Sequence, residues 1–155
     1  MSKIVVLGGS FGGLTAAFQL KRLLGKSAEI TVVSDDDKFV FLPSLPWLII
    51  GKRSPGDITL KVQDILEPRG IKFINEAAAR VEPEASKVYT ATGEVPYDYL
   101  VISTGPHLSF DEIAGLGPDK GHTDCTFTLN HAVAAAGKWK RLLEDPGPVI
   151  VGSSQ

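Results

Sequence analysis

Small residues cluster directly after the first apolar run of the chain. Residues 4–7 read IVVL and the next six read GGSFGG, so that Gly8, Ser10 and Gly13 occupy the three small positions of a phosphate-binding turn. Such a turn needs a tight bend, a close approach of backbone to the anion, and close packing of helix on strand. Ser10 replaces the usual middle glycine with a small side chain whose hydroxyl can also bind phosphate. The pattern predicts a turn that holds the pyrophosphate of a dinucleotide.

An acidic residue follows at the spacing that a ribose contact requires. Asp35 comes just after the second predicted strand, residues 29–33, about 20 residues beyond the glycines. The glycines alone also fit a turn without a ligand, which is the competing interpretation. The flanking strand and helix, together with Asp35, favour dinucleotide binding.

The hydrophobic periodicity predicts the elements that position these residues. Apolar runs predict strands at 4–7, 29–33, 71–74 and 99–103, and the run at 99–103 is typical of a central strand buried on both faces. Helical spacing predicts helices at 13–24, 57–66 and 130–144, and short alternating pieces predict an antiparallel meander at 80–82, 87–90 and 94–97. The order predicts an α/β, Rossmann-like domain with a central parallel sheet, helices on one or both faces, and a small β-meander.

The two most apolar stretches outside these elements are harder to assign. Residues 42–50 read LPSLPWLII and are expected to form a buried or ligand-facing loop and the start of a helix, because two prolines interrupt them. Residues 149–151 resemble the opening strand and are followed by glycine and serine. We therefore expect a dinucleotide-binding domain at 1–147, and at 148–155 the start of a truncated second domain or a strand that returns to the first sheet.

Composition excludes several other classes of protein. The formal net charge is -2, which gives no general attraction for nucleic acid. A single cysteine cannot form an internal disulfide, and the three histidines show no metal-ligand spacing, so we expect no metal site. Neither a signal peptide nor a transmembrane segment is evident, so we expect a cytoplasmic or peripheral membrane protein.

A second motif narrows the cofactor. Residues 95–105 read VPYDYLVISTG and resemble the second flavin-side motif of the disulfide-reductase superfamily of flavoproteins with two dinucleotide-binding domains. That motif is usually written ATG where this chain has Ser103, Thr104 and Gly105. Within the superfamily the chain most resembles the sulfide:quinone oxidoreductase family, over its whole length. The stretches that carry this resemblance are VVLGGSFGGLTAAFQL, VVSDDDKFVFLPSLPW, FINEAAARVEPEASKVYTATGEVPYDYLVISTGP and DCTFTLNHAV.

The resemblance implies FAD as the cofactor and assigns residues to it. Ser34 and Asp35 would meet the adenosine ribose, Ala78 would lie at the adenine, and Pro43 would pack near the flavin ring. Thr104 with Gly105 would let the backbone approach the cofactor. The pyrophosphate would be held by Gly8, Gly9, Ser10, Gly12 and Gly13.

Cys125 matches a cysteine that lies beside the flavin in this family, and it is the catalytic candidate. Without the resemblance, a buried small hydrophobe is an equally good interpretation of a lone cysteine. The resemblance implies a parent enzyme that oxidises sulfide and passes two electrons through FAD to a quinone, with peripheral membrane association and oligomerisation left open. With one cysteine, the 155-residue chain is expected not to turn over sulfide alone.

Three alternatives to this function are open at the level of sequence. A type II NADH:quinone dehydrogenase shares the opening motif and the YDYLVI strand, and a sulfide-oxidising flavocytochrome is disfavoured because no export signal is evident. The alternative outside the enzymes is an isolated FAD-binding module without turnover.

Overall fold

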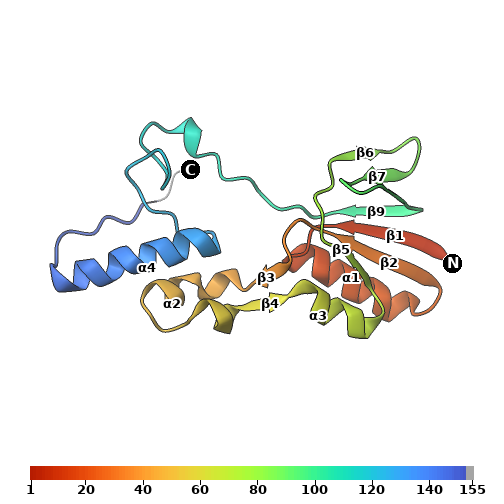
Figure 1. The fold of residues 1–155 in the computed structure, drawn as a ribbon, viewed down its shortest axis with the longest axis horizontal. Coiled ribbons are helices and arrows are strands. Elements are labelled where there is room, and N and C mark those ends of the chain that lie inside the picture. The colour runs from red at the N-terminus through yellow and green to blue at the C-terminus, as the bar shows by residue number, and fades with distance from the viewer. Residues whose placement is uncertain (153–155) are drawn as a thin grey trace. The chain divides into compact units, whose positions relative to one another are not determined.

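Two units make up residues 1–152, the part of the chain that the computed structural model describes (Figure 1). The first unit contains Met1–Val40 and Thr59–Leu108, and the second contains Phe41–Ile58 and the chain from Ser109 onward. The first unit has the helices α1 (Phe11–Leu24) and α3 (Val62–Leu66). Its strands are β1 (Ser2–Leu7), β2 (Ala28–Val33), β3 (Lys38–Val40), β4 (Thr59–Lys61), β5 (Lys72–Ile74), β6 (Arg80–Glu82), β7 (Lys87–Tyr89), β8 (Glu94–Pro96) and β9 (Tyr99–Ile102).

A parallel sheet is the centre of the first unit. Its four strands follow the order β5-β2-β1-β9, and every neighbouring pair is parallel. The register aligns Ile4 of β1 with Ile30 of β2 on one side and with Tyr99 of β9 on the other. The predicted α/β class with a central parallel sheet is confirmed.

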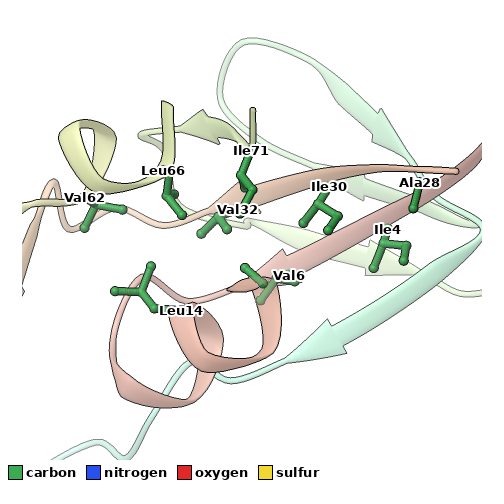
Figure 2. Packing of buried hydrophobic residues seen from close by; sticks show 10 residues of the cluster. Ile4, Val6, Leu14, Ala28, Ile30, Val32, Val62, Leu66 and Ile71 are labelled. Atoms are coloured by element: carbon green, nitrogen blue, oxygen red, sulfur yellow. The ribbon is translucent and has the colours of Figure 1, made fainter. Parts of the chain in front are cut away.

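Alternate side chains of β1 enter two different apolar clusters, as the pleat of a strand requires. Ile4 and Val6 belong to the cluster that Leu14 of α1 and Leu66 of α3 complete, and Figure 2 shows these side chains gathered between strands and helices. Val5 and Leu7 pack on the opposite face of the sheet, in a second cluster that β7 of the meander completes. The sheet is therefore covered by helices on one face and by the meander on the other.

The meander itself agrees closely with its prediction. Strands β6, β7 and β8 form an antiparallel sheet in that order, and Val88 of β7 is fully buried against the parallel sheet. The Glu76 carboxylate, just after β5, accepts hydrogen bonds from the hydroxyl of Thr92 at 2.7 Å and from its backbone N–H at 3.1 Å. This contact ties the exit of β5 to the turn between β7 and β8.

The single helix predicted at 57–66 is wrong. The chain instead forms a 3-10 helix at Pro55–Ile58, the strand β4, and the short helix α3. Strand β4 pairs antiparallel with β3, a strand that the sequence pattern did not predict, so that Leu60 lies opposite Phe39. This pairing competes successfully with the helical spacing of Ile58, Val62 and Ile65, because it satisfies the backbone of β4.

Strand β9 is an edge strand, which contradicts its prediction as a central strand buried on both faces. In the described part of the chain it pairs with β1 alone. Tyr99 and Ile102 are each 64% exposed as a result. The apolar content of residues 99–103 correctly predicts a strand, but it does not indicate how many strands pair with it.

The second unit is built around a helix pair, α2 (Leu45–Ile49) and α4 (Leu129–Glu144), which pack on each other. Its remaining regular elements are 3-10 helices, including Leu42–Ser44 and Phe110–Glu112. Helix α4 begins at the N-cap Thr128, whose side chain accepts a hydrogen bond from His131 N–H at 3.2 Å. The expected helix start within residues 42–50 is confirmed.

The strand expected near the C-terminal end of the chain is absent from the described residues. Val149, Ile150 and Val151 form no strand and are exposed, because no strand within residues 1–152 pairs with their backbone. Ser153, Ser154 and Gln155, which completed that expected motif, lie outside the described residues. The predicted domain boundary at 147/148 stays a prediction.

Candidate functional site

The turns that follow three parallel strands meet at the carboxyl edge of the sheet. Residues 8–13 follow β1, Ser34 and Asp35 follow β2, and residues 103–105 follow β9. These turns contain nine of the twelve predicted site residues, and Ala78 also lies in the first unit. In open α/β sheets this edge is where ligands bind. The structure therefore brings the two sequence motifs together at one edge.

The glycines of the first turn are required by close backbone contacts. Gly8 has φ +110°, and a Cβ atom there would overlap the carbonyl oxygen of Ser103. A Cβ atom on Gly12 would overlap the Ser103 side chain, and one on Gly13 would overlap the Gly8 carbonyl oxygen. The turn after β1 thus closes on itself and against the turn after β9.

The N-terminus of α1 opens onto this edge with no anionic side chain of its own. Ser10 is the N-cap residue, but its side chain makes no capping hydrogen bond, and no acidic residue lies in the first turn. Gly12 and Gly13 lie in that turn, where backbone N–H groups have no acceptor within the helix. The helix dipole and these N–H groups together favour a bound anion.

The turn after β2 is held by the neighbouring strand β5. Ser34 N–H donates to the Ile74 carbonyl at 3.1 Å, which extends the parallel ladder by one bond. The Asn75 side-chain amide then donates from Nδ2 to the carbonyl oxygens of Ser34 and Asp35, at 3.0 Å each. Asn75 is not among the predicted site residues, although a polar residue directly after a predicted strand is a usable signal.

The Asp35 side chain is exposed and open to a ligand. No other described residue hydrogen-bonds or ion-pairs with its carboxylate. Ser34 is buried, and a Cβ atom on Gly9 would lie 3.1 Å from its Oγ. Ser34 therefore packs against the glycine turn, and Asp35 extends from the same edge.

Three further predicted residues lie on the first unit. Ala78, between β5 and β6, packs against the meander-side cluster. Thr104 and Gly105 are exposed after β9, and Gly105 has φ +78°, a conformation that favours glycine. Near Ala78, the Thr92 hydroxyl lowers the pKa of the Glu76 carboxyl by hydrogen bonding to it.

Pro43 and Cys125 lie in the second unit. Pro43 is exposed within the 3-10 helix Leu42–Ser44. Cys125 is half-buried, and its Sγ accepts a hydrogen bond from Phe127 N–H at 3.3 Å. The neighbouring Asp124 carboxylate is paired with Lys138 Nζ at 2.6 Å, so its charge is partly neutralised by that lysine.

Neither His122 nor His131, the histidines of the second unit, forms a hydrogen bond with Cys125. His122 N–H donates to the Gly115 carbonyl, and its side chain is exposed. The ring of His131 packs edge-on against Phe110 with centroids 5.9 Å apart, and its buried Nδ1 has no hydrogen-bond partner among the described residues.

Metal sites and membrane-spanning helices are absent from the described residues. Within residues 1–152, no three side chains of histidine, cysteine, aspartate or glutamate come together as metal ligands. No helix in this part of the chain has the length and apolar character needed to cross a bilayer.

Comparison with known proteins identifies the family. Residues 2–154 match the pyridine nucleotide-disulphide oxidoreductase family. The sulfide-quinone reductase of Aquifex aeolicus is 37% identical over 151 residues, covering 97% of this chain and 34% of that protein. A type II NADH:quinone oxidoreductase of Mycobacterium tuberculosis is 29% identical over 142 residues, covering 86% of this chain and 30% of that protein.

A solved structure extends this likeness to three dimensions. The X-ray structure of the sulfide:quinone oxidoreductase from Aquifex aeolicus matches with a TM-score of 0.85 at 36% identity, covering 96% of this chain and 34% of that one. The chain thus spans about a third of the length of the relatives it matches. The resemblance to sulfide:quinone oxidoreductases is confirmed, and the chain belongs to the pyridine nucleotide-disulphide oxidoreductase family.

Proposed function

We propose that this chain binds FAD at the carboxyl edge of the parallel sheet and is the FAD-binding part of an enzyme that oxidises sulfide and reduces a quinone. The observation that carries the proposal is the contact of Gly8 and Gly12 with Ser103. This contact joins the glycine turn to the STG turn, the two motifs on which the resemblance to flavoproteins rests.

In this proposal the first turn holds the pyrophosphate. Gly8, Gly9, Gly12 and Gly13 supply backbone without side chains at close range, and the uncapped start of α1 supplies N–H groups and a positive dipole end. The Ser10 hydroxyl makes no capping bond and is available to a phosphate oxygen. This part of the chain fits a dinucleotide phosphate by its chemistry and by its lack of side-chain bulk.

The two ends of the cofactor would meet different turns. Ser34 and Asp35 would bind the adenosine ribose, with Ala78 at the adenine, since all three lie on or near the β2 and β5 side of the edge. Thr104 and Gly105 follow β9 and would allow backbone to approach the isoalloxazine end. When bound, FAD would supply the two-electron transfer between the electron donor and the quinone.

Sulfide is favoured over NADH as the electron donor of the whole protein. Identity is 37% to a sulfide-quinone reductase and 29% to a type II NADH:quinone oxidoreductase. Cys125 adds to this preference as the proposed catalytic thiol beside the flavin, with Pro43 proposed to pack on the ring. The type II NADH:quinone dehydrogenase remains the second candidate because it matches the same region of the chain.

The whole protein would act with sulfide and quinone, and peripheral association with a membrane would give it access to the quinone. The 155-residue chain contains one cysteine, and we propose that it binds FAD without turning over sulfide.

A titration of the purified apo chain with FAD, monitored by quenching of flavin fluorescence, tests whether the chain binds this cofactor. We expect saturable one-to-one binding. Ser10→Glu places a carboxylate at the proposed phosphate site and should weaken FAD binding at least about tenfold, because like charges repel there. Ser109→Glu adds the same charge in the second unit and should leave FAD affinity unchanged. A wild-type chain that binds no FAD would contradict the proposal.

The electron donor is tested in two further assays. Addition of sulfide to the FAD-loaded chain should leave the flavin absorption unbleached. The full-length protein should reduce a quinone with sulfide faster than with NADH. A full-length protein that reduces quinone with NADH and ignores sulfide would establish the second candidate instead.

A further inference from the structure

Asn75 contacts the backbone of both residues that we assign to the adenosine ribose. Strand β5 ends at Ile74, next to the end of β2, so Asn75 follows directly at the carboxyl edge (Figure 1). Its Nδ2 lies 3.0 Å from the carbonyl oxygen of Ser34 and 3.0 Å from that of Asp35. One amide group therefore fixes two consecutive peptide units.

The chemistry of these contacts requires an amide nitrogen. Both partners are carbonyl oxygens, which accept hydrogen bonds and cannot donate them. The two hydrogens of the Asn75 NH2 group match two acceptors, whereas a carboxylate in the same place would face both oxygens with negative charge. Asparagine is therefore specified at this position by donor count, and aspartate, which has the same shape, is excluded by charge.

The contacts matter because the carbonyl groups of Ser34 and Asp35 lie beyond the end of the parallel ladder. Ser34 N–H makes the last ladder bond, to Ile74, and the carbonyl groups of Ser34 and Asp35 are then held by the Asn75 side chain. Asp35 itself is exposed, and no other described residue holds its carboxylate. Asn75 thus holds the backbone from which the Asp35 side chain extends, and so fixes the direction of its Cα–Cβ bond.

We propose that Asn75 is a positioning residue for recognition of the ribose hydroxyl groups, acting through the backbone of Ser34 and Asp35. The inference rests on the proposed FAD site, and it specifies how that site distinguishes a ribose from a deoxyribose. Asn75 does not touch the ligand in this proposal, and its effect on binding is transmitted by Asp35.

The test compares ADP with 2′-deoxy-ADP as competitors of FAD on the wild-type chain and on variants of Asn75. The wild-type chain should bind ADP about tenfold more tightly than 2′-deoxy-ADP, because a carboxylate bond to the 2′-hydroxyl is lost in the analogue. Asn75→Ala should weaken FAD about fivefold to tenfold and bring the ratio of the two competitor affinities close to one. Asn75→Asp should weaken FAD at least as much.

A double-mutant cycle separates positioning from general stability. Asp35→Asn should lower the same ratio, and Asn75→Ala added to Asp35→Asn should have little further effect, because both changes remove one shared interaction. Asn130→Ala, at an exposed asparagine of α4, should change neither FAD affinity nor the ratio. Thermal unfolding of each apo variant shows whether it folds, and Asn75→Ser, which keeps one donor, replaces Asn75→Ala if the latter does not.

The outcomes are distinct. If Asn75→Ala weakens ADP and 2′-deoxy-ADP equally, or if its effect adds fully to that of Asp35→Asn, Asn75 has a structural role alone and the inference is overturned. If the wild-type chain binds FAD and the Asn75 variants bind it equally well, the inference fails while the proposed function stands. If the wild-type chain binds no FAD, the proposed function fails, and the inference fails with it.

Discussion

The two units differ in what holds their candidate site residues in place. In the first unit, the residues after β1, β2 and β9 follow directly from a parallel ladder and lie against one another, with Gly8 touching Ser103 and Gly9 touching Ser34. In the second unit, Cys125 lies in an irregular segment before α4, and its thiol has one described hydrogen bond, from Phe127 N–H. Strand ends thus constrain a site through the backbone, whereas an irregular segment leaves its side chain weakly specified.

The same contrast appears in packing. The parallel sheet is covered on both faces, and each face has its own buried cluster. The buried apolar residues of the second unit are Leu45, Leu48, Ile58 and the alanines Ala132 and Ala135 of α4. Substitutions in the first unit should therefore cost more than comparable substitutions in the second.

Gly8→Ala should have the largest effect on the free energy of unfolding. The added Cβ would overlap the Ser103 carbonyl oxygen at a backbone φ of +110°, so strain and overlap together should lower the free energy of unfolding by about 4 kcal/mol. Urea denaturation measures the change. Gly93→Ala, where an added Cβ meets no atom within 4 Å, should stay within about 0.5 kcal/mol of the wild type. If the two variants lose the same free energy of unfolding, Gly8 is no more tightly constrained than a glycine in an ordinary turn.

Leu66→Ala should follow in size. Leu66 is 0% exposed in the helix-side cluster, and its truncation should lower the free energy of unfolding by about 3 kcal/mol through lost burial and a cavity. Leu143→Ala removes the same atoms from a side chain of α4 that is 63% exposed, and it should cost less than about 0.5 kcal/mol. A loss below 1 kcal/mol for Leu66→Ala would show that the first unit is not the better packed one.

Gly137→Ala should act in the opposite direction, in the second unit. Gly137 lies inside α4, and an added Cβ would meet no atom within 4 Å. Alanine is the better helix former, so the free energy of unfolding should rise by about 0.5–1 kcal/mol, which urea denaturation would detect. A destabilised variant would indicate that the helix is more closely covered at this position than the contacts show.

The smallest effect is expected from Glu76 on acidification. The Thr92 hydroxyl, with further bonds from Thr90 and from the Thr92 backbone, holds the pKa of Glu76 below the ordinary carboxyl value. Folding therefore favours the ionised form, so the contribution is complete above the ordinary carboxyl pKa and is lost as pH falls through the lowered value. Thr92→Val should make unfolding less sensitive to pH in that acidic window, as measured by urea denaturation in a pH series. Thr126→Val, at an exposed threonine, is the control, and an unchanged pH profile in Thr92→Val would contradict the assignment.

Local pattern predicted most of the first unit because its strands and turns carry their own signals. The β-branched run of β1, the alternating pieces of the meander and the glycine turn were each recognised close to their actual bounds. The prediction failed at β4, where Thr59–Lys61 has helical neighbours in sequence and a strand partner, β3, in space. It also failed for the position of β9 in the sheet, because apolar content is similar for edge and central strands.

Some residues of the candidate site were likewise predictable from local pattern, and others were not. Motif spacing identified Gly8, Gly13 and Asp35. The tight turn requires glycine at the first two positions, and a ribose hydroxyl requires a carboxylate at the third. Asn75 directly follows a predicted strand, but its contacts with Ser34 and Asp35 depend on β5 lying beside β2, which the position of Asn75 along the chain does not indicate. Cys125 was singled out by resemblance alone, since nothing in its neighbours along the chain specifies a reactive thiol.

Periodicity, turn residues and glycine requirements are local properties, so they identify most elements of the first unit and the chemistry of the first turn, but not β3 and β4. The strand order, the edge position of β9 and the contact of Gly8 and Gly12 with Ser103 were decided only in the tertiary structure. The physical reason is that these features join residues about 90 positions apart, whose approach depends on which strands share hydrogen bonds and which faces are buried together.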